Sequence, residues 1–128
     1  MTGAIVALRI EDPVTRGAFV YAPAVAHITP ELDAAAKDAD AIFVDGTFWT
    51  ANEMVDLGLS TRNAVDMGHV PISGAGGSLG WFRAKKAAHR VYVHINNTNP
   101  VLNASTPERK VVDAAGVRVG CDGDEFVV

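Results

Sequence analysis

The chain has 128 residues, of which 48% are hydrophobic and 20% charged, a balance typical of one globular domain over residues 1–128 and not of a disordered chain. Its net charge of -4 provides no attraction to nucleic acid or to anionic membranes, so we expect neither as a partner. The single cysteine, Cys121, and the lack of an apolar run of about 20 residues predict a cytoplasmic protein without an intrachain disulfide or a membrane helix.

The first third of the chain predicts a hairpin, a helix and a buried strand. Segments 4–10 and 17–21 are rich in strand-forming residues and are separated by turn-forming ones, so we expect a β-hairpin. A threonine and a proline suited to a helix start precede apolar residues at helical spacing, which predicts a helix over 30–37. The wholly apolar run 41–44 predicts a strand covered on both faces, with Asp45 at its carboxyl end.

The middle of the chain is dominated by a long loop. Thr50 and Glu53 have the spacing of a capping box, which predicts a short helix that ends before Gly58. Residues 58–78 are small, polar and glycine-rich without periodicity. We therefore expect a shaped loop with one helical turn at 63–66, and loops of this length are commonly functional.

The last third again alternates helices and strands. Ser78 is a candidate cap for a helix over 79–88, which leads into a strand over 91–93. The alternation predicts an α/β fold in which helices pack on a sheet. The remaining predicted elements are a helix that begins at Pro107 and ends at Gly116 and two strands over 117–121 and 125–128.

One carboxylate and two imidazoles lie at strand ends and in a loop, the positions at which functional sites are usually found. Asp45 and His94 each follow a predicted strand, and His69 lies in the long loop. Together they are candidate ligands of a divalent metal such as iron or zinc. A structural interpretation stays open for each: a turn cap for Asp45, a packed loop residue for His69, and an anchor of the next loop for His94.

Two loops near these residues also admit two interpretations. Asn96, Asn97 and Asn99 can bind the polar groups of a substrate, but such clusters more often hold a loop by bonding its own backbone. The glycine-rich segment 74–78 can offer backbone amides to an anion. It lacks the Lys-Ser/Thr ending of a P-loop, so a close-packed turn is favoured.

Three segments resemble one family when they are taken together. They are Val-Asp-Gly-Thr-Phe-Trp at 44–49, Asp-Met-Gly-His-Val-Pro-Ile-Ser-Gly at 66–74 and Val-His-Ile-Asn-Asn-Thr-Asn-Pro at 93–100. The chain resembles the coenzyme PQQ synthesis protein B family of the metallo-β-lactamase-fold superfamily over its whole length. The resemblance implies the C-terminal half of an αββα fold, with one mixed β-sheet and helices on one face.

The resemblance also implies roles for the candidate residues. Asp45 is similar to the bridging aspartate of the superfamily's metal centre, His94 to its last histidine ligand, and His69 to a catalytic histidine that handles protons or positions substrate. The implied activity is a metal-dependent, oxygen-using hydroxylation of a tyrosine-derived precursor of pyrroloquinoline quinone (PQQ), with iron as the expected metal and zinc as the alternative. The amides of Asn96, Asn97 and Asn99 would then shape the mouth of the site.

The same resemblance implies that this chain alone is incomplete. The histidine- and aspartate-rich motif of the superfamily's first half is missing, so we expect weak or no metal binding by the isolated chain. The uncovered sheet face implies a homodimer or pairing with the missing N-terminal half. Two other functions stay open: a carrier of PQQ or its precursor toward the periplasm, and an inactive fragment.

Overall fold

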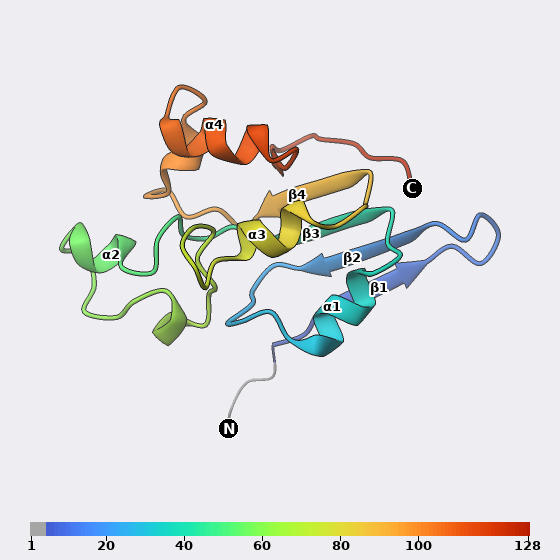
Figure 1. Ribbon diagram of the computed structural model, residues 1–128, viewed down its shortest axis with the longest axis horizontal. Helices are drawn as coiled ribbons and strands as arrows, with labels where there is room; N and C mark the ends of the chain where they lie inside the picture. The colour runs from blue at the N-terminus through green and yellow to red at the C-terminus, as the bar shows by residue number, and fades with distance from the viewer. Residues whose placement is uncertain (1–4) are drawn as a thin grey trace.

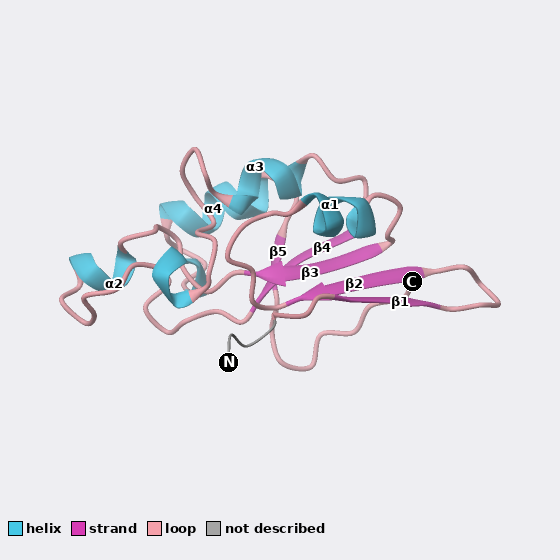
Figure 2. Ribbon diagram, turned by 90° about the horizontal axis from the view of Figure 1, so that it is seen from below, coloured by secondary structure: helices cyan, strands magenta, loops and turns pink. Residues whose placement is uncertain are grey.

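The computed structural model describes residues 5–128, which contain five strands and four α-helices. The strands are β1 (Leu8–Glu11), β2 (Ala18–Ala22), β3 (Ala41–Asp45), β4 (His89–Val93) and β5 (Arg118–Val119). The helices are α1 (Pro30–Ala36), α2 (Glu53–Asp56), α3 (Ser78–Arg83) and α4 (Pro107–Ala114), with 3₁₀ turns η1 (Val65–Met67) and η2 (Pro100–Leu102). The strands form one sheet in the order β1-β2-β3-β4-β5, and α1, α3 and α4 lie on one of its faces (Figure 1, Figure 2).

The sheet is mixed. β1 and β2 pair antiparallel as the predicted hairpin, whereas β2, β3, β4 and β5 pair in parallel. This confirms the predicted α/β architecture with a mixed sheet and helices on one face. Because parallel strands run the same way, the carboxyl ends of β3 and β4 meet at one edge, where Asp45 pairs in register with Val93. The loops that follow these two strands therefore start side by side.

The core lies between the sheet and the helices, because alternate residues of each strand point to that side. Val20 and Ile42 are fully buried there. Tyr92 of β4 packs edge-to-face against Phe82 of α3, with 5.1 Å between ring centroids. Its hydroxyl lies 2.9 Å from the Ser78 hydroxyl, and burial raises the pKa of the Tyr92 hydroxyl well above its usual value. The tyrosine therefore stays protonated and ties α3 to the sheet.

The predicted threonine cap of α1 is confirmed, and α4 also begins with a threonine cap. The Thr29 hydroxyl accepts a hydrogen bond from the backbone N of Leu32 at 3.1 Å, and the Thr106 hydroxyl accepts one from the backbone N of Arg109 at 3.2 Å. The predicted Ser78 cap is wrong. The Ser78 side chain is fully buried and bonds the tyrosine of β4, so α3 begins without a side-chain cap.

Other predicted boundaries are also wrong. The first strand begins at Leu8 and not near Ala4, which lies outside the described residues. The helix predicted over 79–88 ends at Arg83, and 125–128 is not a strand. All helices of the described segment are too short to cross a lipid bilayer.

The other face of the sheet is only partly covered. Phe43 contacts Phe19 on β2, with 4.9 Å between ring centroids, and Phe126 from the C-terminal segment, with 5.0 Å. Leu8 and Ile10 of β1 remain 50% and 54% exposed on the same face. The C-terminal segment thus covers the middle of this face, and the β1 side stays open to solvent.

Candidate metal centre

Asp45, the last residue of β3, is completely buried. Its Oδ1 accepts hydrogen bonds from the backbone N and the hydroxyl of Thr47, at 3.0 and 2.6 Å. Its Oδ2 accepts one from the backbone N of Val25 at 2.8 Å and lies 2.7 Å from Nδ1 of His69. A buried carboxylate needs such donors, because an unpaired buried charge is costly. Asp45 therefore has the turn-capping role that the sequence left open and also anchors His69.

His69 reaches the site from the long loop predicted over 58–78. Gly68 precedes it with a φ of 87°, the left-handed conformation that ends η1 and that glycine adopts without strain. The backbone N of His69 then donates to the carbonyl of Ala64 at 2.9 Å. Because the Asp45 carboxylate can only accept, Nδ1 of His69 carries the proton between them. A neutral His69 therefore has a free lone pair on Nε2.

His94 directly follows β4 with a φ of 57°. This left-handed region is uncommon for residues other than glycine, and such outliers concentrate at functional sites. The turn brings Nδ1 of His94 to 2.8 Å from the Thr47 hydroxyl. It also stacks the imidazole on that of His69, with 5.3 Å between ring centroids and 22° between planes. The His94 side chain is exposed, so it is open to a ligand.

Asp45, His69 and His94 form one cluster, in which their candidate ligand atoms lie within 4.8 Å of one another. Imidazole nitrogen and carboxylate oxygen suit zinc and iron, so the donor chemistry fits a divalent metal. Few atoms of the cluster are free to bind a metal, because both Asp45 oxygens already accept two hydrogen bonds each. The Nε2 atoms of the two histidines are therefore the donors that this chain offers most readily.

Thr47 is the residue of this cluster that the sequence analysis missed. Its hydroxyl lies 2.6 Å from Asp45 Oδ1, 2.8 Å from His94 Nδ1 and 3.2 Å from His69 Nδ1. A signal for it existed, since a side-chain oxygen of aspartate commonly bonds the backbone two residues further on. That turn carries the side chain of Thr47 back beside the carboxylate.

The amide-rich loop after β4 is a brace for this site. Asn99 is 2% exposed, and its Nδ2 donates to the carbonyl of Gly46 at 2.9 Å. Nδ2 of Asn96 donates to the Thr98 hydroxyl at 2.6 Å. These two amides therefore have the structural role that the sequence left open, and Asn99 is not available to a substrate. Asn97 is exposed to solvent.

A buried carboxylate on α2 completes the brace. Glu53 does not form the predicted capping box with Thr50, because Glu53 Oε2 accepts a hydrogen bond from the backbone N of Trp49 at 2.7 Å. Glu53 Oε1 accepts one from the Thr98 hydroxyl at 2.6 Å. The capping-box prediction is therefore wrong, and Glu53 joins the loop after β3 to the loop after β4.

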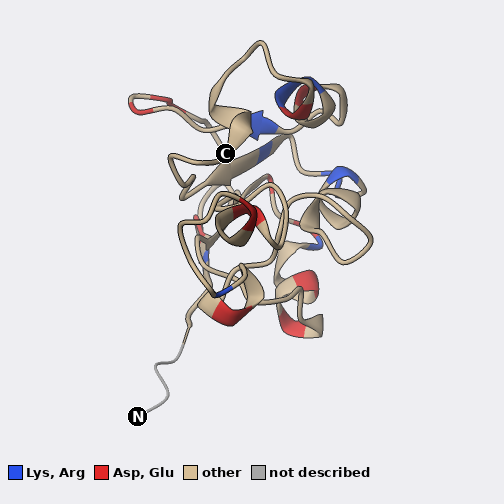
Figure 3. Cartoon of the chain, turned by 90° about the vertical axis from the view of Figure 1, so that its left-hand side faces the viewer, with Lys and Arg blue, Asp and Glu red and all other residues tan. Residues whose placement is uncertain are grey.

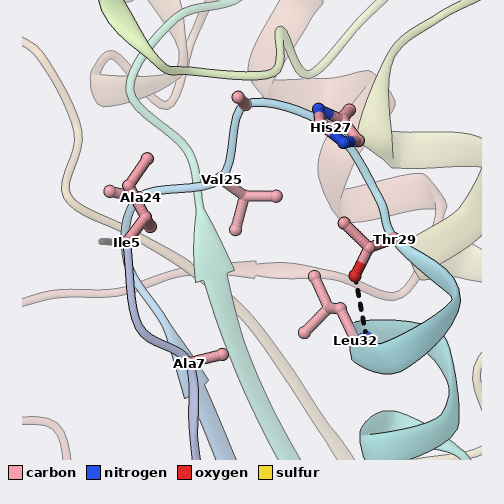
Figure 4. Close-up of a pocket in the computed structure, with 8 residues that line it drawn as sticks. Ile5, Ala7, Ala24, Val25, His27, Thr29 and Leu32 are labelled. Carbon is pink, nitrogen blue, oxygen red and sulfur yellow. Dashed lines mark hydrogen bonds between the residues drawn. The ribbon is translucent and has the colours of Figure 1, made fainter. Parts of the chain in front are cut away.

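One pocket adjoins the cluster, and a second lies near the backbone that supports it. The first, of about 330 Å³, opens beside His94 on the sheet face away from the helices. The other is mainly apolar and lies between the start of α1 and the segment before β1 (Figure 4). None of the three candidate ligands lines this second pocket, but Val25, whose backbone N bonds Asp45, does. The pocket beside His94 is lined chiefly by Phe43, Val91, Val93, Phe126, Cys121, Asp122 and Asp124.

Several curated relatives of this chain carry the description coenzyme PQQ synthesis protein B. The protein from Nitrosococcus oceani is 36% identical over 126 residues, which cover 98% of this chain and 41% of the relative. The protein from Azoarcus sp. is 45% identical over 104 residues, which cover 80% of this chain and 34% of the relative. The chain thus spans about two fifths of the length of the curated relatives it matches. The resemblance found in the three sequence segments is confirmed.

A solved structure agrees with these relatives. The 1.98-angstrom crystal structure of Zn(2+)-bound PqqB from Methylobacterium extorquens matches 97% of this chain and 44% of that chain, with a TM-score of 0.90 and 35% identity. Residues 1–95 also match the family model described as the Beta-lactamase superfamily domain. Since this model covers most of the chain, the chain belongs to the beta-lactamase superfamily.

Proposed function

We propose that this chain takes part in PQQ biosynthesis as a portion of a metal-dependent enzyme. The observation that carries the proposal is the Asp45, His69 and His94 cluster at the carboxyl edge of the sheet. Its support comes from relatives described as PQQ synthesis proteins and from a neighbour described as Zn(2+)-bound. In this proposal the reaction is the oxygen-dependent hydroxylation of a small, tyrosine-derived PQQ precursor in the cytoplasm, and iron is the working metal.

The histidines would hold the metal through nitrogen. The Nδ1 contact between His94 and Thr47 leaves Nε2 of the exposed His94 free, and the Nδ1 bond between His69 and Asp45 leaves Nε2 of His69 free. A bound iron would supply redox chemistry with oxygen that amino-acid side chains lack. The protein's own contribution is to fix the two rings, and the bond from His69 Nδ1 to Asp45 Oδ2 orients His69 directly.

The pocket beside His94 is the place that we propose for the precursor. Phe43 and Phe126 meet edge-to-face at its wall, and an aromatic ring of the substrate can pack on such a surface. Cys121, Asp122 and Asp124 supply polar groups to the same pocket. An aromatic amino-acid derivative fits this mixture of apolar wall and polar groups.

The chain also needs a partner for its open sheet face. We propose that the N-terminal portion present in longer relatives, or a second copy of this chain, covers Leu8 and Ile10 and supplies further metal donors. Nucleic acid and membranes are not part of this proposal. α4 contains both acidic and basic residues, and the charged residues of α2 are all acidic (Figure 3). Neither helix offers the basic surface that phosphate backbones need.

An anaerobic titration followed by an oxygen pulse tests the proposed activity. The chain, paired with the N-terminal portion of a relative, is loaded with ferrous iron and mixed with the tyrosine-derived precursor, and oxygen uptake and hydroxylated product are measured. We expect turnover that His94→Ala abolishes and that His27→Ala, at an exposed position outside the cluster, leaves unchanged. Tight PQQ binding without metal or turnover would instead support the carrier function.

A further inference from the structure

The Thr47 hydroxyl occupies the centre of the cluster, between one carboxylate and two imidazoles. It is 5% exposed. Its three polar contacts are with Asp45 Oδ1, His94 Nδ1 and His69 Nδ1, at 2.6, 2.8 and 3.2 Å. A threonine hydroxyl has one proton to donate and two lone pairs to accept with. The identity of each neighbour therefore decides how these bonds are directed.

The direction of the bonds follows from the carboxylate. Asp45 can only accept, and the 2.6 Å contact is the shortest of the three, so the Thr47 proton points to Asp45 Oδ1. With that proton committed, the Thr47 oxygen can only accept from His94. Nδ1 of His94 must therefore carry a proton, as Nδ1 of His69 does toward Asp45 Oδ2.

We propose that Thr47 is a positioning residue that fixes the Nδ1–H tautomer of His94 and thereby directs its Nε2 lone pair to the metal. This inference rests on the proposed metal centre and extends it to a residue outside the candidate ligand set. Asp45 acts on both rings, on His69 directly and on His94 through Thr47. One buried carboxylate thus orients two candidate ligands that come from different loops.

The backbone supports this arrangement. The carbonyl of Thr47 accepts a hydrogen bond from the backbone N of Asn96 at 3.1 Å, and the backbone N of Gly46 donates to the carbonyl of Val93 at 2.8 Å. A Cβ on Gly46 would lie 2.8 Å from that of Tyr92, so glycine permits this close approach of the two strands' ends. The hydroxyl is therefore held between the two histidines by two fixed segments.

The tautomers can be measured directly in the metal-free chain. Nitrogen-15 chemical shifts of the histidine rings, recorded at alkaline pH where imidazoles are neutral, distinguish a protonated Nδ1 from a protonated Nε2. We expect the Nδ1–H form for His94 in the wild type and in Thr47→Ser. In Thr47→Val and Thr47→Ala, which lack the acceptor, we expect a shift toward the Nε2–H form that dominates in free histidine. Thr50→Val is the matched control, because Thr50 is exposed and lies three residues further along the same loop.

A second measurement connects the tautomer with the metal. The zinc affinity of each variant is measured by competition with a chromophoric chelator, on the chain paired with the N-terminal portion. We expect Thr47→Val and Thr47→Ala to weaken binding by about 10–100-fold, as is typical when a partner of a metal-ligating histidine is lost, and Thr47→Ser to retain it. An Nε2–H form of His94 in the wild type, or an unchanged tautomer and affinity in both Val and Ala variants, would overturn the inference. Because neither readout uses turnover, a failure of the proposed hydroxylation leaves this test intact.

Discussion

Asp45 shows how one buried residue can organise a site without being exposed to it. Its carboxylate accepts from two backbone amides, a hydroxyl and an imidazole. Each oxygen thus has two donors, which is close to its full capacity. A metal bound directly to Asp45 would have to compete with these bonds, whereas the two histidine Nε2 atoms have no such competition.

Replacing Asp45 by asparagine tests this description of the carboxylate. Asparagine has an NH₂ group in place of one carboxylate oxygen, and this NH₂ group cannot accept a hydrogen bond. At least one buried donor therefore loses its acceptor, at a cost of about 1–3 kcal/mol. We expect Asp45→Asn to lower the free energy of unfolding by at least that amount in urea denaturation. Asp122→Asn, at an exposed position, serves as the control. Equal stability of the two variants would contradict the hydrogen-bond set described here.

The sequence indicated the candidate ligands but not their connections. Asp45 and His94 were identified because each directly follows a predicted strand, and the end of a strand is visible in the sequence as a change from apolar to polar residues. Thr47 was missed because its importance comes from three contacts through space, two of them with residues 22 and 47 positions away. Contacts of that kind depend on loop geometry, which a single sequence does not contain.

At the scale of elements, the buried apolar strands and the threonine-capped helices were predictable, because each follows from a local pattern. The errors concern side chains whose partners are distant. Ser78 and Glu53 have the right positions for caps, yet Ser78 bonds Tyr92 and Glu53 bonds Thr98. Tertiary contacts therefore override the local capping preference at both places.

The Glu53 brace makes a prediction at this scale. Glu53 accepts hydrogen bonds from the backbone N of Trp49 and from the Thr98 hydroxyl. In Glu53→Gln the side-chain NH₂ group would meet one of these two donors, and that hydrogen bond would be lost. We expect a loss of about 1–3 kcal/mol in the free energy of unfolding, together with faster amide exchange in the loop after β4. Glu108→Gln on α4, whose side chain takes no part in the brace, is the comparison. A stability loss without faster exchange in that loop would show that Glu53 does not brace it.

Asp33 predicts a pH dependence for the contact between α1 and α3. Hydrogen bonds from Lys85 and Trp81 lower the pKa of Asp33 below its ordinary value of 3.8. A carboxyl group with a depressed pKa in the folded state stabilises the fold above its unfolded pKa, and the contribution is lost as the pH falls through the lower folded pKa. We expect Trp81 fluorescence to report loosening of this contact only below about pH 4. Asp33→Asn should show the fluorescence of the loosened contact already at neutral pH. If the wild type and Asp33→Asn differ by the same amount at neutral pH and below pH 4, the assignment is contradicted.

At the scale of the whole molecule, one side of the sheet stays uncovered by the other residues of the described range, 5–128. Leu8, Ile10 and Tyr21 are 50%, 54% and 37% exposed and come together on β1 and β2. Exposed apolar surfaces of this kind commonly mark an interface. The chain also spans about two fifths of the length of the curated relatives it matches.

This surface predicts self-association of the chain when it is expressed alone. We expect dimers or larger species in size-exclusion chromatography with light scattering, and a shift toward monomer in the double variant Leu8→Lys, Ile10→Lys. Val14→Lys is the control, because Val14 is 87% exposed at the hairpin tip and lies outside this surface. Wild-type chain that stays monomeric at high concentration would show that the open face needs no partner.

The central claim is that the histidines at the carboxyl edge of the sheet form a metal centre. Calorimetric titration of the chain with zinc, in the wild type and in His69→Ala, His94→Ala and His27→Ala, tests it most directly. We expect one weak site in the wild type, lost in His69→Ala and His94→Ala and retained in His27→Ala. Zinc binding that is the same in all four proteins would contradict the claim.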